Sequence, residues 1–412
     1  MKVDTMRAID YWVGVPLCLL LSAVDAILRA VRMAPRRVPK RILFIELSEM
    51  GSAILADPAM RRARQRFGAD IFFAIFAVNR PSLNLLRTVP EPNVFVFRSE
   101  GFWMLVADMA RFVVWSRRLP IDTVVDLELF SRVSALLARL SGADNRVGFH
   151  AFYNEGLYRG SLMTRRVAYN PHMHIAKNFV ALVMALEADD IQIPFTKMPV
   201  ADEDVRIAAV VPAPEDLARA RALLLGACPA YRPGETRLVL LNAHGSALLP
   251  LRRWPAERYV ELARVILDGF ADAVAVLIGA PDEREECERL ARQVARDRCV
   301  SLAGKFQLEQ LPTLYSLARV MVSNDSGPVH FAAATDMPVV ALYGPETPVL
   351  YGPLGRGIAL SAGLACSPCV SAANHRRTAC TDNVCMKAIP VARVFDSVAR
   401  IMREDPNRAR MP

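Results

Sequence analysis

The stretch from Val320 to Tyr351, VMVSNDSGPVHFAAATDMPVVALYGPETPVLY, decides the fold class of this chain. Residues 320–322 and 339–343 are short apolar runs rich in valine, as expected for strands buried on both faces of a parallel sheet. The polar turn between them ends at Gly327, and Pro328 suits the first turn of a helix. The stretch therefore predicts a strand, a turn, a helix over 329–335 and a second strand, with the turn at the carboxyl end of the first strand.

The turn carries groups suited to a phosphorylated ligand. The backbone N–H groups of Ser326 and Gly327 would lie at the start of a helix, where unpaired donors and the helix dipole favour phosphate. Asp325 is placed to hold a ribose hydroxyl, and His330 to reach a phosphate oxygen. An ordinary β–α turn, in which Asp325 caps the helix and His330 is half buried, explains the spacing equally well.

The run NDSGPVHFAAATDMPVVALYGPETP closely resembles the donor-nucleotide signature of glycosyltransferase family 9, the heptosyltransferases of lipopolysaccharide core assembly. The shared pattern is Asp-Ser-Gly, a histidine three residues later, a helix of small residues, then Pro-Val and Gly-Pro. The resemblance extends from about Arg41 to the C-terminus, and it implies a nucleotide-sugar donor site that also includes Gly344. One departure follows Gly344-Pro345, where Glu346 comes before Thr347 and the family pattern has threonine.

The length, composition and net charge of the chain indicate a folded protein with an acidic partner. The chain has 412 residues, which suggests two domains and an appendage, and 53% of them are hydrophobic, which excludes a disordered protein. A net charge of +9 indicates an anionic membrane or a phosphorylated substrate. No zinc-finger spacing or RNA-binding aromatic motif stands out, so no nucleic-acid partner is expected.

Strands and helices alternate along the chain at the spacing of doubly wound parallel sheets. The predicted strands are 41–47, 70–78, 94–97, 122–127, 145–149, 237–243, 273–279, 299–302, 320–322 and 339–343. The resemblance implies a GT-B architecture, two Rossmann-like α/β domains facing a cleft. We expect an acceptor-binding domain over 41–205 and a donor-binding domain over 206–412, the latter with a Cys-rich tail and a C-terminal helix.

Residues 1–40 predict a membrane-associating segment. Residues 11–24 are apolar, and a cluster of arginines follows from Arg29 to Arg41. Fourteen apolar residues are short for a spanning helix, so the segment is expected to lie in the anionic cytoplasmic leaflet. The protein would then be cytoplasmic and peripheral on the inner face of the inner membrane. The alternative is a helix packed on the protein's own surface.

The first domain departs from the family at Gly51-Ser52, where the usual pattern is Gly-Asp. The resemblance makes that aspartate the general base on the acceptor hydroxyl, and Ser52 cannot accept a proton unaided near neutral pH. Glu49 and Asp57 are the nearest carboxylates, and we prefer Glu49 because its turn should face the cleft. Glu49 as a solvated charge at a helix start, and loss of activity, both stay open.

The segment from His244 to Pro255 resembles the family's diphosphate-binding turn. It begins with His244, Gly245 and Ser246, and its basic pair is Arg252 and Arg253. Arg252 stands where the family has lysine, and a cation there would neutralise the leaving diphosphate. Without the resemblance, both arginines are more simply surface charges.

Lys177 lies on a helix predicted near the acceptor, together with the Gly51 turn, although a solvated helix face explains Lys177 as well. The tail holds Cys366, Cys369, Cys380 and Cys385, and we expect free thiols there; a structural zinc site is the less favoured alternative, because the ten-residue gap and the absence of a second Cys-x-x-Cys weaken it.

The expected function is inverting transfer of a heptose or related sugar from a nucleotide-sugar, with ADP-heptose as the expected donor, to a lipopolysaccharide core or other lipid-linked saccharide. No cofactor is expected to be required beyond the nucleotide-sugar substrate. The alternative is a catalytically impaired sugar-nucleotide-binding scaffold, suggested by Ser52.

Overall fold

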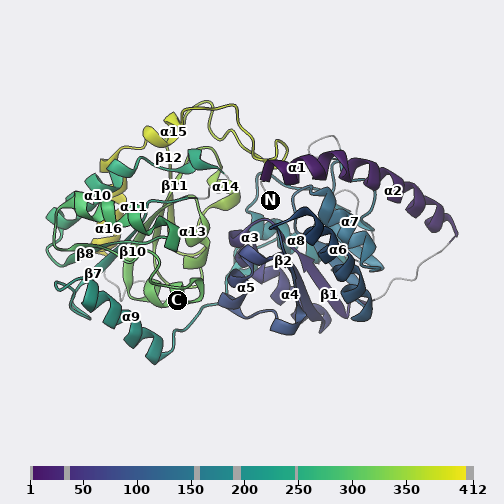
Figure 1. Cartoon of the computed structure of the whole chain (residues 1–412), viewed down its shortest axis with the longest axis horizontal. Helices are drawn as coiled ribbons and strands as arrows, with labels where there is room; N and C mark the ends of the chain where they lie inside the picture. The colour runs from purple at the N-terminus through teal and green to yellow at the C-terminus, as the bar shows by residue number, and fades with distance from the viewer. Residues whose placement is uncertain (1–2, 32–37, 153–157, 189–195, 246–248, 405–412) are drawn as a thin grey trace. The chain divides into compact units, whose positions relative to one another are not determined.

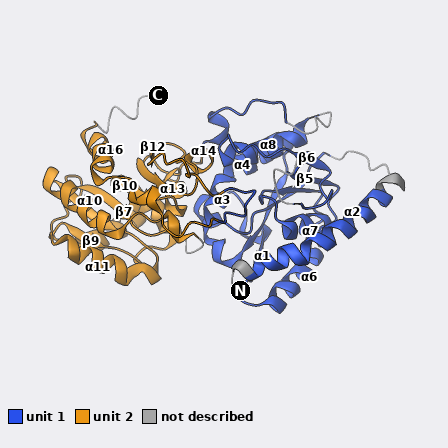
Figure 2. Ribbon diagram, turned by 90° about the horizontal axis from the view of Figure 1, so that it is seen from above, with its two compact units in different colours: residues 1–206, 371–377 blue, residues 207–370, 378–412 orange. Residues whose placement is uncertain are grey.

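The structure is a computed structural model that describes residues 3–31, 38–152, 158–188, 196–245 and 249–404. The chain divides into two compact units (Figure 2): residues 1–206 with 371–377 form unit 1, and residues 207–370 with 378–412 form unit 2. The sequence placed the whole tail with the second domain. Here the short segment 371–377 belongs to unit 1 instead, because its contacts are made there.

Unit 1 is built on a six-stranded parallel sheet in the order β3-β2-β1-β4-β5-β6. Its strands are β1 (Arg41–Ile45), β2 (Asp70–Phe76), β3 (Val94–Phe97), β4 (Thr123–Asp126), β5 (Asn145–Phe149) and β6 (Arg165–Val167). The strand order reverses between β1 and β4, which is the switch point where open α/β sheets bind ligands. The sequence predicted five of these strands and missed the three-residue β6.

Unit 2 repeats the same topology, in the order β12-β11-β10-β7-β8-β9. Its strands are β7 (Arg237–Asn242), β8 (Ala273–Leu277), β9 (Cys299–Ser301), β10 (Ala318–Asn324), β11 (Val339–Tyr343) and β12 (Gly357–Ser361). Its switch point lies between β7 and β10. The expected α/β class, with two Rossmann-like parallel-sheet domains, is confirmed, and only β12 was missed in this unit.

The stretch that decided the fold class forms β10, α13 (Gly327–Ala332) and β11, so the predicted helix starts and ends earlier than expected. Helices cover both sheets (Figure 1). In unit 1 they are α3 (Met50–Leu55), α4 (Asp57–Phe67), α5 (Pro81–Leu86), α6 (Phe102–Arg118), α7 (Arg132–Leu140) and α8 (Ile175–Glu187). In unit 2 they are α9 (Pro214–Ala227), α10 (Ala256–Gly269), α11 (Arg284–Val294), α12 (Leu311–Ser316), α13, α14 (Pro348–Tyr351), α15 (Val384–Lys387) and α16 (Val391–Arg403). Every residue of β4, β8 and β11 is buried, which explains their continuous apolar sequences.

Two further helices, α1 (Val3–Trp12) and α2 (Gly14–Val31), pack along α7 in unit 1. The helical run Thr5–Leu28 is long and apolar enough to cross a membrane, with a mean hydropathy of 1.9. It is therefore longer than the fourteen-residue apolar core read from the sequence. Its outer face remains exposed, since only 17% of the most apolar window is buried.

Two buried acidic residues fix this helical run to unit 1. Asp10 accepts hydrogen bonds from the backbone N–H groups of Arg132 (2.8 Å) and Val133 (2.9 Å), at the start of α7. Asp25 pairs with Arg139 and Arg146. A carboxylate at a helix N-terminus is stabilised by the unpaired N–H groups and the helix dipole, so Asp10 acts as a cap supplied by another helix.

Candidate functional sites at the two switch points

In unit 2, three charged side chains meet at the carboxyl edge of the sheet. Arg252 follows β7, Asp325 follows β10, and Glu346 follows β11. Arg252 Nε lies 3.2 Å from Asp325 Oδ2, and Arg252 Nη2 lies 3.3 Å from Glu346 Oε2. The side chain of Arg252 is 13% exposed, and the two carboxylates are 4% and 1% exposed. The sequence placed Arg252 and Asp325 in one site, and the structure brings them together.

Burial dominates the electrostatics of this cluster. Burial raises the pKa of Asp325, and the positive charge of Arg252 opposes that rise. Burial also raises the pKa of Glu346 to about 7, again opposed by Arg252, while the charge of Asp325 adds to the rise. One guanidinium thus partly offsets two buried carboxylates, and the cluster carries excess negative charge whenever both are ionised.

A buried amide network fixes the loops around this cluster. The Asn324 Nδ2 donates to the carbonyl oxygens of Ala243 (2.9 Å) and His244 (3.1 Å), and its Oδ1 accepts from Trp254 N–H (2.9 Å). One side chain therefore joins the end of β10 to both ends of the loop that follows β7. Asn242 Nδ2 in turn donates to Ser326 Oγ at 3.0 Å. Neither asparagine was predicted as a site residue, although a polar amide at the end of a buried apolar strand must find hydrogen-bond partners and is therefore an informative signal.

The other predicted donor residues take several positions. His244 is buried with its ring 3.2 Å from Cys287 Sγ and 3.7 Å from Glu283 Oε1, so its side chain is directed towards α11. Arg253 Nη2 donates to the carbonyl oxygen of Gly245, which supports the loop. His330 is buried in α13.

The predicted Gly344 has a steric explanation. A Cβ on Gly344 would lie 2.6 Å from Met386 Sδ, so this position has room only for glycine. Gly327 begins α13, with Ser326 immediately before it. Ser246 lies outside the described residues.

In unit 1, carboxylates gather at the corresponding edge. Glu46 follows β1 and Glu128 follows β4, and both are buried. The backbone N–H groups of Leu47 (2.7 Å) and Ser48 (2.9 Å) donate to Glu128 Oε1 across the switch point. Burial, reinforced by the charge of Glu128, raises the pKa of Glu46 well above its usual value. Burial likewise raises the pKa of Glu128, and the N–H of Leu47 opposes that rise.

Glu49 lies beside Ser52, as the sequence required for a substitute base. Ser52 Oγ donates to Glu49 Oε2 at 3.1 Å, and Arg376 contacts the other carboxylate oxygen. Arg376 comes from the segment 371–377, and burial lowers its pKa to about 10 while the charge of Glu46 opposes the fall. His375 and Arg376 have φ of 53° and 54°, which is an uncommon conformation for consecutive residues other than glycine. Arg376 lies far from Glu49 in the chain, so nothing in the sequence indicates that the two meet.

Asp57, the other carboxylate considered as a substitute base, has different partners. It is fully buried in α4, pairs with Arg61 at 2.8 Å and accepts a hydrogen bond from Thr88. The predicted acceptor residue Lys177 lies on α8 and forms an ion pair with Asp202 at 2.7 Å. Gly51 lies in the first turn of α3.

The four tail cysteines are free thiols, with Cys366 and Cys380 exposed, Cys369 partly exposed and Cys385 buried. Within the described ranges, no group of three or more His, Cys, Asp or Glu side chains is arranged to hold a metal ion. The less favoured zinc alternative therefore has no such group of side chains at these cysteines.

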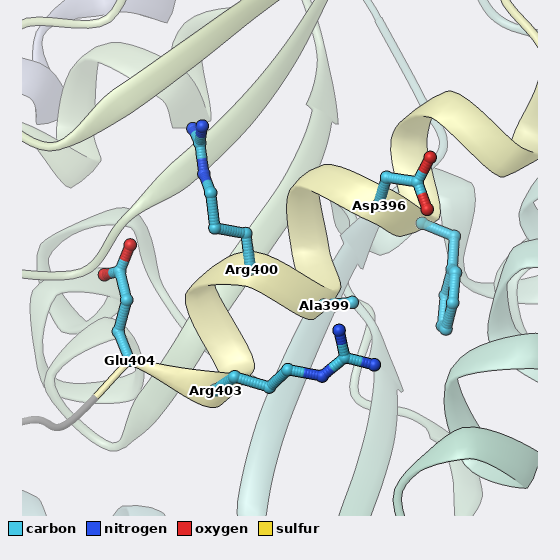
Figure 3. Close-up of a pocket in the computed structure, with 6 residues that line it drawn as sticks. Asp396, Ala399, Arg400, Arg403 and Glu404 are labelled. Carbon is cyan, nitrogen blue, oxygen red and sulfur yellow. The ribbon is translucent and has the colours of Figure 1, made fainter.

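A depression of about 460 Å³ lies at the C-terminal end of α16 (Figure 3). It is lined by Phe395, Asp396, Ala399, Arg400, Arg403 and Glu404. The carbonyl oxygens of Met402 and Ile401 in this helix accept hydrogen bonds from Arg237 and Arg319, which begin β7 and β10. The depression therefore lies at the amino edge of the sheet, opposite Arg252 and Asp325.

Comparison with known proteins places these features in a family. The sequence pattern of glycosyltransferase family 9 (heptosyltransferase) matches residues 121–379, which is more than half of the chain. Lipopolysaccharide heptosyltransferase 2 of Salmonella typhimurium is 38% identical over 133 residues, covering 31% of this chain and 37% of that relative. The match thus spans little more than a third of that relative's length.

Solved structures share the fold over nearly the whole chain. A family 9 glycosyltransferase from Veillonella parvula has a TM-score of 0.67 at 21% identity, covering 90% of this chain and 99% of the other. The E. coli heptosyltransferase WaaC with ADP-2-deoxy-2-fluoro heptose has a TM-score of 0.56 at 19% identity, covering 87% and 99%.

Proposed function

The chain belongs to glycosyltransferase family 9, and from this membership we propose that it transfers a heptose or related sugar from ADP-heptose. The acceptor is a hydroxyl of a lipopolysaccharide core or another lipid-linked saccharide. The observation that carries the proposal is the charged cluster at the unit 2 switch point, where Arg252 and Asp325 meet. An ADP-heptose analogue in the related E. coli structure motivates the choice of donor.

The donor side of the reaction is assigned to unit 2. The guanidinium of Arg252 binds the diphosphate and stabilises the negative charge that grows on it as the bond to the sugar breaks. Asp325 binds a hydroxyl of the nucleotide sugar through Oδ2, which lies 3.2 Å from Arg252 Nε without forming a hydrogen bond to it. The amides of Ser326 and Gly327, together with His330, bind phosphate oxygens.

The acceptor side is assigned to unit 1. The acceptor oxygen attacks the anomeric carbon as the bond from that carbon to the β-phosphate oxygen breaks, so the configuration inverts. The hydroxyl proton passes to Glu49, which Ser52 orients through its 3.1 Å hydrogen bond. Lys177 and the Gly51 turn contact the acceptor. The ion pair between Lys177 and Asp202 is weak because the Asp202 side chain is 89% exposed, so Lys177 can leave Asp202 and bind an acidic group of the acceptor instead.

We also propose that α1 and α2 bind the anionic cytoplasmic surface of the inner membrane as a peripheral anchor. A spanning orientation would remove Asp10 and Asp25 from their partners on unit 1 and place both in hydrocarbon. Helix α2 also packs closely against Gly160 of unit 1, since a Cβ at Gly160 would lie 2.4 Å from Ser22 Oγ and 2.8 Å from the carbonyl oxygen of Cys18. The opposite face exposes Trp12 (74%), Leu20 (60%) and Ile27 (67%), which suits insertion to the depth of the headgroups.

Nucleotide release tests the catalytic proposal. Purified protein, ADP-heptose and truncated lipopolysaccharide acceptors are combined, and ADP release is measured beside thermal shifts with ADP, UDP and GDP. We expect ADP release that depends on the acceptor and a thermal shift with ADP. The absence of any nucleotide-induced shift would contradict the donor site.

Ser52 favours one alternative, a sugar-nucleotide-binding scaffold that has lost turnover. In that case ADP would shift the melting temperature, and no acceptor in the panel would release ADP. The same two measurements therefore separate the enzyme from the scaffold.

A further inference from the structure

We propose that α6 gives unit 1 a second membrane contact, through an outward-facing apolar stripe that is bordered by arginines. The stripe consists of Trp103, Ala107, Ala110 and Val114. Its occupant is the same anionic bilayer surface to which α1 and α2 are assigned above. The inference rests on that proposed anchor and extends it from the N-terminal helices to the body of the unit.

The outward side of α6 is apolar along most of its length. Trp103 is 78% exposed and Val114 is 50% exposed, and Ala107 and Ala110 are exposed between them. Spacings of four, three and four residues place these side chains on one face of a helix. Phe102 contacts Trp103 edge to face, with ring centroids 5.3 Å apart, and extends the apolar surface at the first turn. A helix on the surface of a soluble protein normally has its polar side outwards, so this face is typical of a binding surface.

The charges beside the stripe are positive. Arg111, Arg117 and Arg118 are exposed on its flanks. The one acidic residue of the helix, Asp108, is buried on the opposite side, where it pairs with Arg98 at 2.7 Å and with Arg111 at 2.8 Å. Within α6, all of which the structure describes, no carboxylate is therefore exposed. An apolar stripe bordered by arginines complements the acyl boundary and the phosphates of anionic lipids.

The stripe lies on the side of unit 1 that carries the proposed anchor. Helix α7 packs against both α2 and α6, and one hydrophobic cluster joins Leu21 of α2, Phe112 of α6 and Leu136 of α7 to the sheet. Figure 2 shows α2, α7 and α6 on this side of the unit, with α4 and α8 on the opposite side. Residues 134–138 of α7 are all buried, so α2 and α6 flank this helix and form the outer surface. A flat bilayer can therefore rest on α2 and α6 together.

Fluorescence quenching tests the contact at Trp103 directly. The Trp12→Phe variant removes the indole of the proposed anchor and keeps an apolar ring in its place. Phosphatidylglycerol vesicles with brominated acyl chains should quench this variant, because Trp103 enters the acyl boundary. Adding Trp103→Phe should abolish the quenching while the protein still floats with the vesicles. Phosphatidylcholine vesicles, which have no net charge, should bind and quench less.

Vesicle flotation measures how much the stripe contributes to binding. Trp103→Gln with Val114→Gln should bind phosphatidylglycerol vesicles about tenfold more weakly than wild type, because two apolar side chains no longer leave water. Val78→Gln with Val211→Gln, at valines that are 66% and 87% exposed outside the stripe, is the matched control and should bind as wild type. Melting temperature checks that both double variants are folded.

The outcomes separate this contact from the anchor on which it rests. Undiminished flotation after the changes at Trp103 and Val114, or quenching that persists without Trp103, would overturn the contact at α6 and leave the anchor standing. Failure of the wild-type protein to float would overturn both. A change in oligomeric mass without a change in flotation would assign the stripe to a second copy of the chain and overturn the membrane contact. The quenching comparison uses only tryptophan-to-phenylalanine changes, so it decides the question even if the glutamine variant does not fold.

Discussion

Arg376, near the C-terminus, contacts the carboxylate of Glu49, the residue that precedes α3 and accepts a hydrogen bond from Ser52. The segment that carries Arg376 belongs to unit 1, although the chain on both sides of it belongs to unit 2. A second contact fixes the same segment, because Arg7 Nη2 of α1 donates to the carbonyl of His375 at 2.8 Å. The candidate acceptor site therefore combines the start of unit 1, its N-terminal helix and a distant part of the tail.

Glu49→Gln should abolish sugar transfer and leave donor binding intact. Glutamine keeps the shape and the hydrogen bond from Ser52 but cannot accept the acceptor proton, so we expect a loss of about 100-fold or more in kcat. The measurement is acceptor-dependent ADP release beside calorimetric binding of ADP-heptose. Glu91→Gln, at a carboxylate that is 76% exposed in the same unit, is the control. Transfer at the wild-type rate in Glu49→Gln would end the assignment.

Arg252→Ala should lose both donor binding and stability. Two carboxylates, 4% and 1% exposed, would be left without their cation, a change that typically costs about 3–5 kcal/mol. Arg252→Lys keeps the charge and should retain most of the stability while binding ADP-heptose more weakly, because lysine is not a forked donor. Chemical denaturation and calorimetry measure the two effects, and equal loss of stability in both variants would contradict the ion cluster.

Glu46→Gln should stabilise unit 1 at neutral pH. The folded-state pKa of Glu46 is raised, so the folded form holds more protons than the unfolded form above the usual glutamate pKa, and stability falls as pH rises through that interval. Glutamine removes the ionisation, and we expect a higher melting temperature at pH 7.5 with a smaller gain at pH 4.5. Thermal unfolding at both pH values tests this. A loss of stability at pH 7.5 would show that the attraction between Glu46 and Arg376 outweighs burial.

Asn324→Ala should destabilise unit 2 by about 2–4 kcal/mol. The change leaves the N–H of Trp254 and the carbonyls of Ala243 and His244 without their buried partner. Asn324→Leu fills a similar volume but offers no hydrogen bond, so it should not restore stability. Recovery in Asn324→Leu would mean that packing, rather than the amide network, holds the loop after β7.

The double variant Leu20→Gln with Ile27→Gln should bind anionic vesicles about 100-fold more weakly than wild type. Each apolar side chain contributes about 1.5 kcal/mol or more when it leaves water. Vesicle flotation measures the change, and melting temperature checks that the exposed face was altered without unfolding. Val211→Gln, at a side chain that is 87% exposed in unit 2, is the matched control. Undiminished flotation of the double variant would contradict the proposed anchor.

The sequence predicted most of the architecture because its strands are buried on both faces. Continuous apolar runs such as those of β8 and β11 are recognisable wherever they occur, and the turn after β10 stands out between two of them. β6 and β12 were not predicted, because neither forms a long apolar run. β6 has only three residues, and β12 begins with an exposed glycine.

The sequence by itself determined the two Rossmann-like domains, the family and the prediction that Arg252 and Asp325 serve one donor site, because these depend on local patterns and motif resemblance. Only the tertiary structure decided that Glu346 shares Arg252, that Arg376 contacts Glu49 and that Asp10 caps α7. Each of these contacts joins residues far apart in the chain. A charge in a linear sequence gives no sign of its partner, whereas a buried charge in the folded chain must have one.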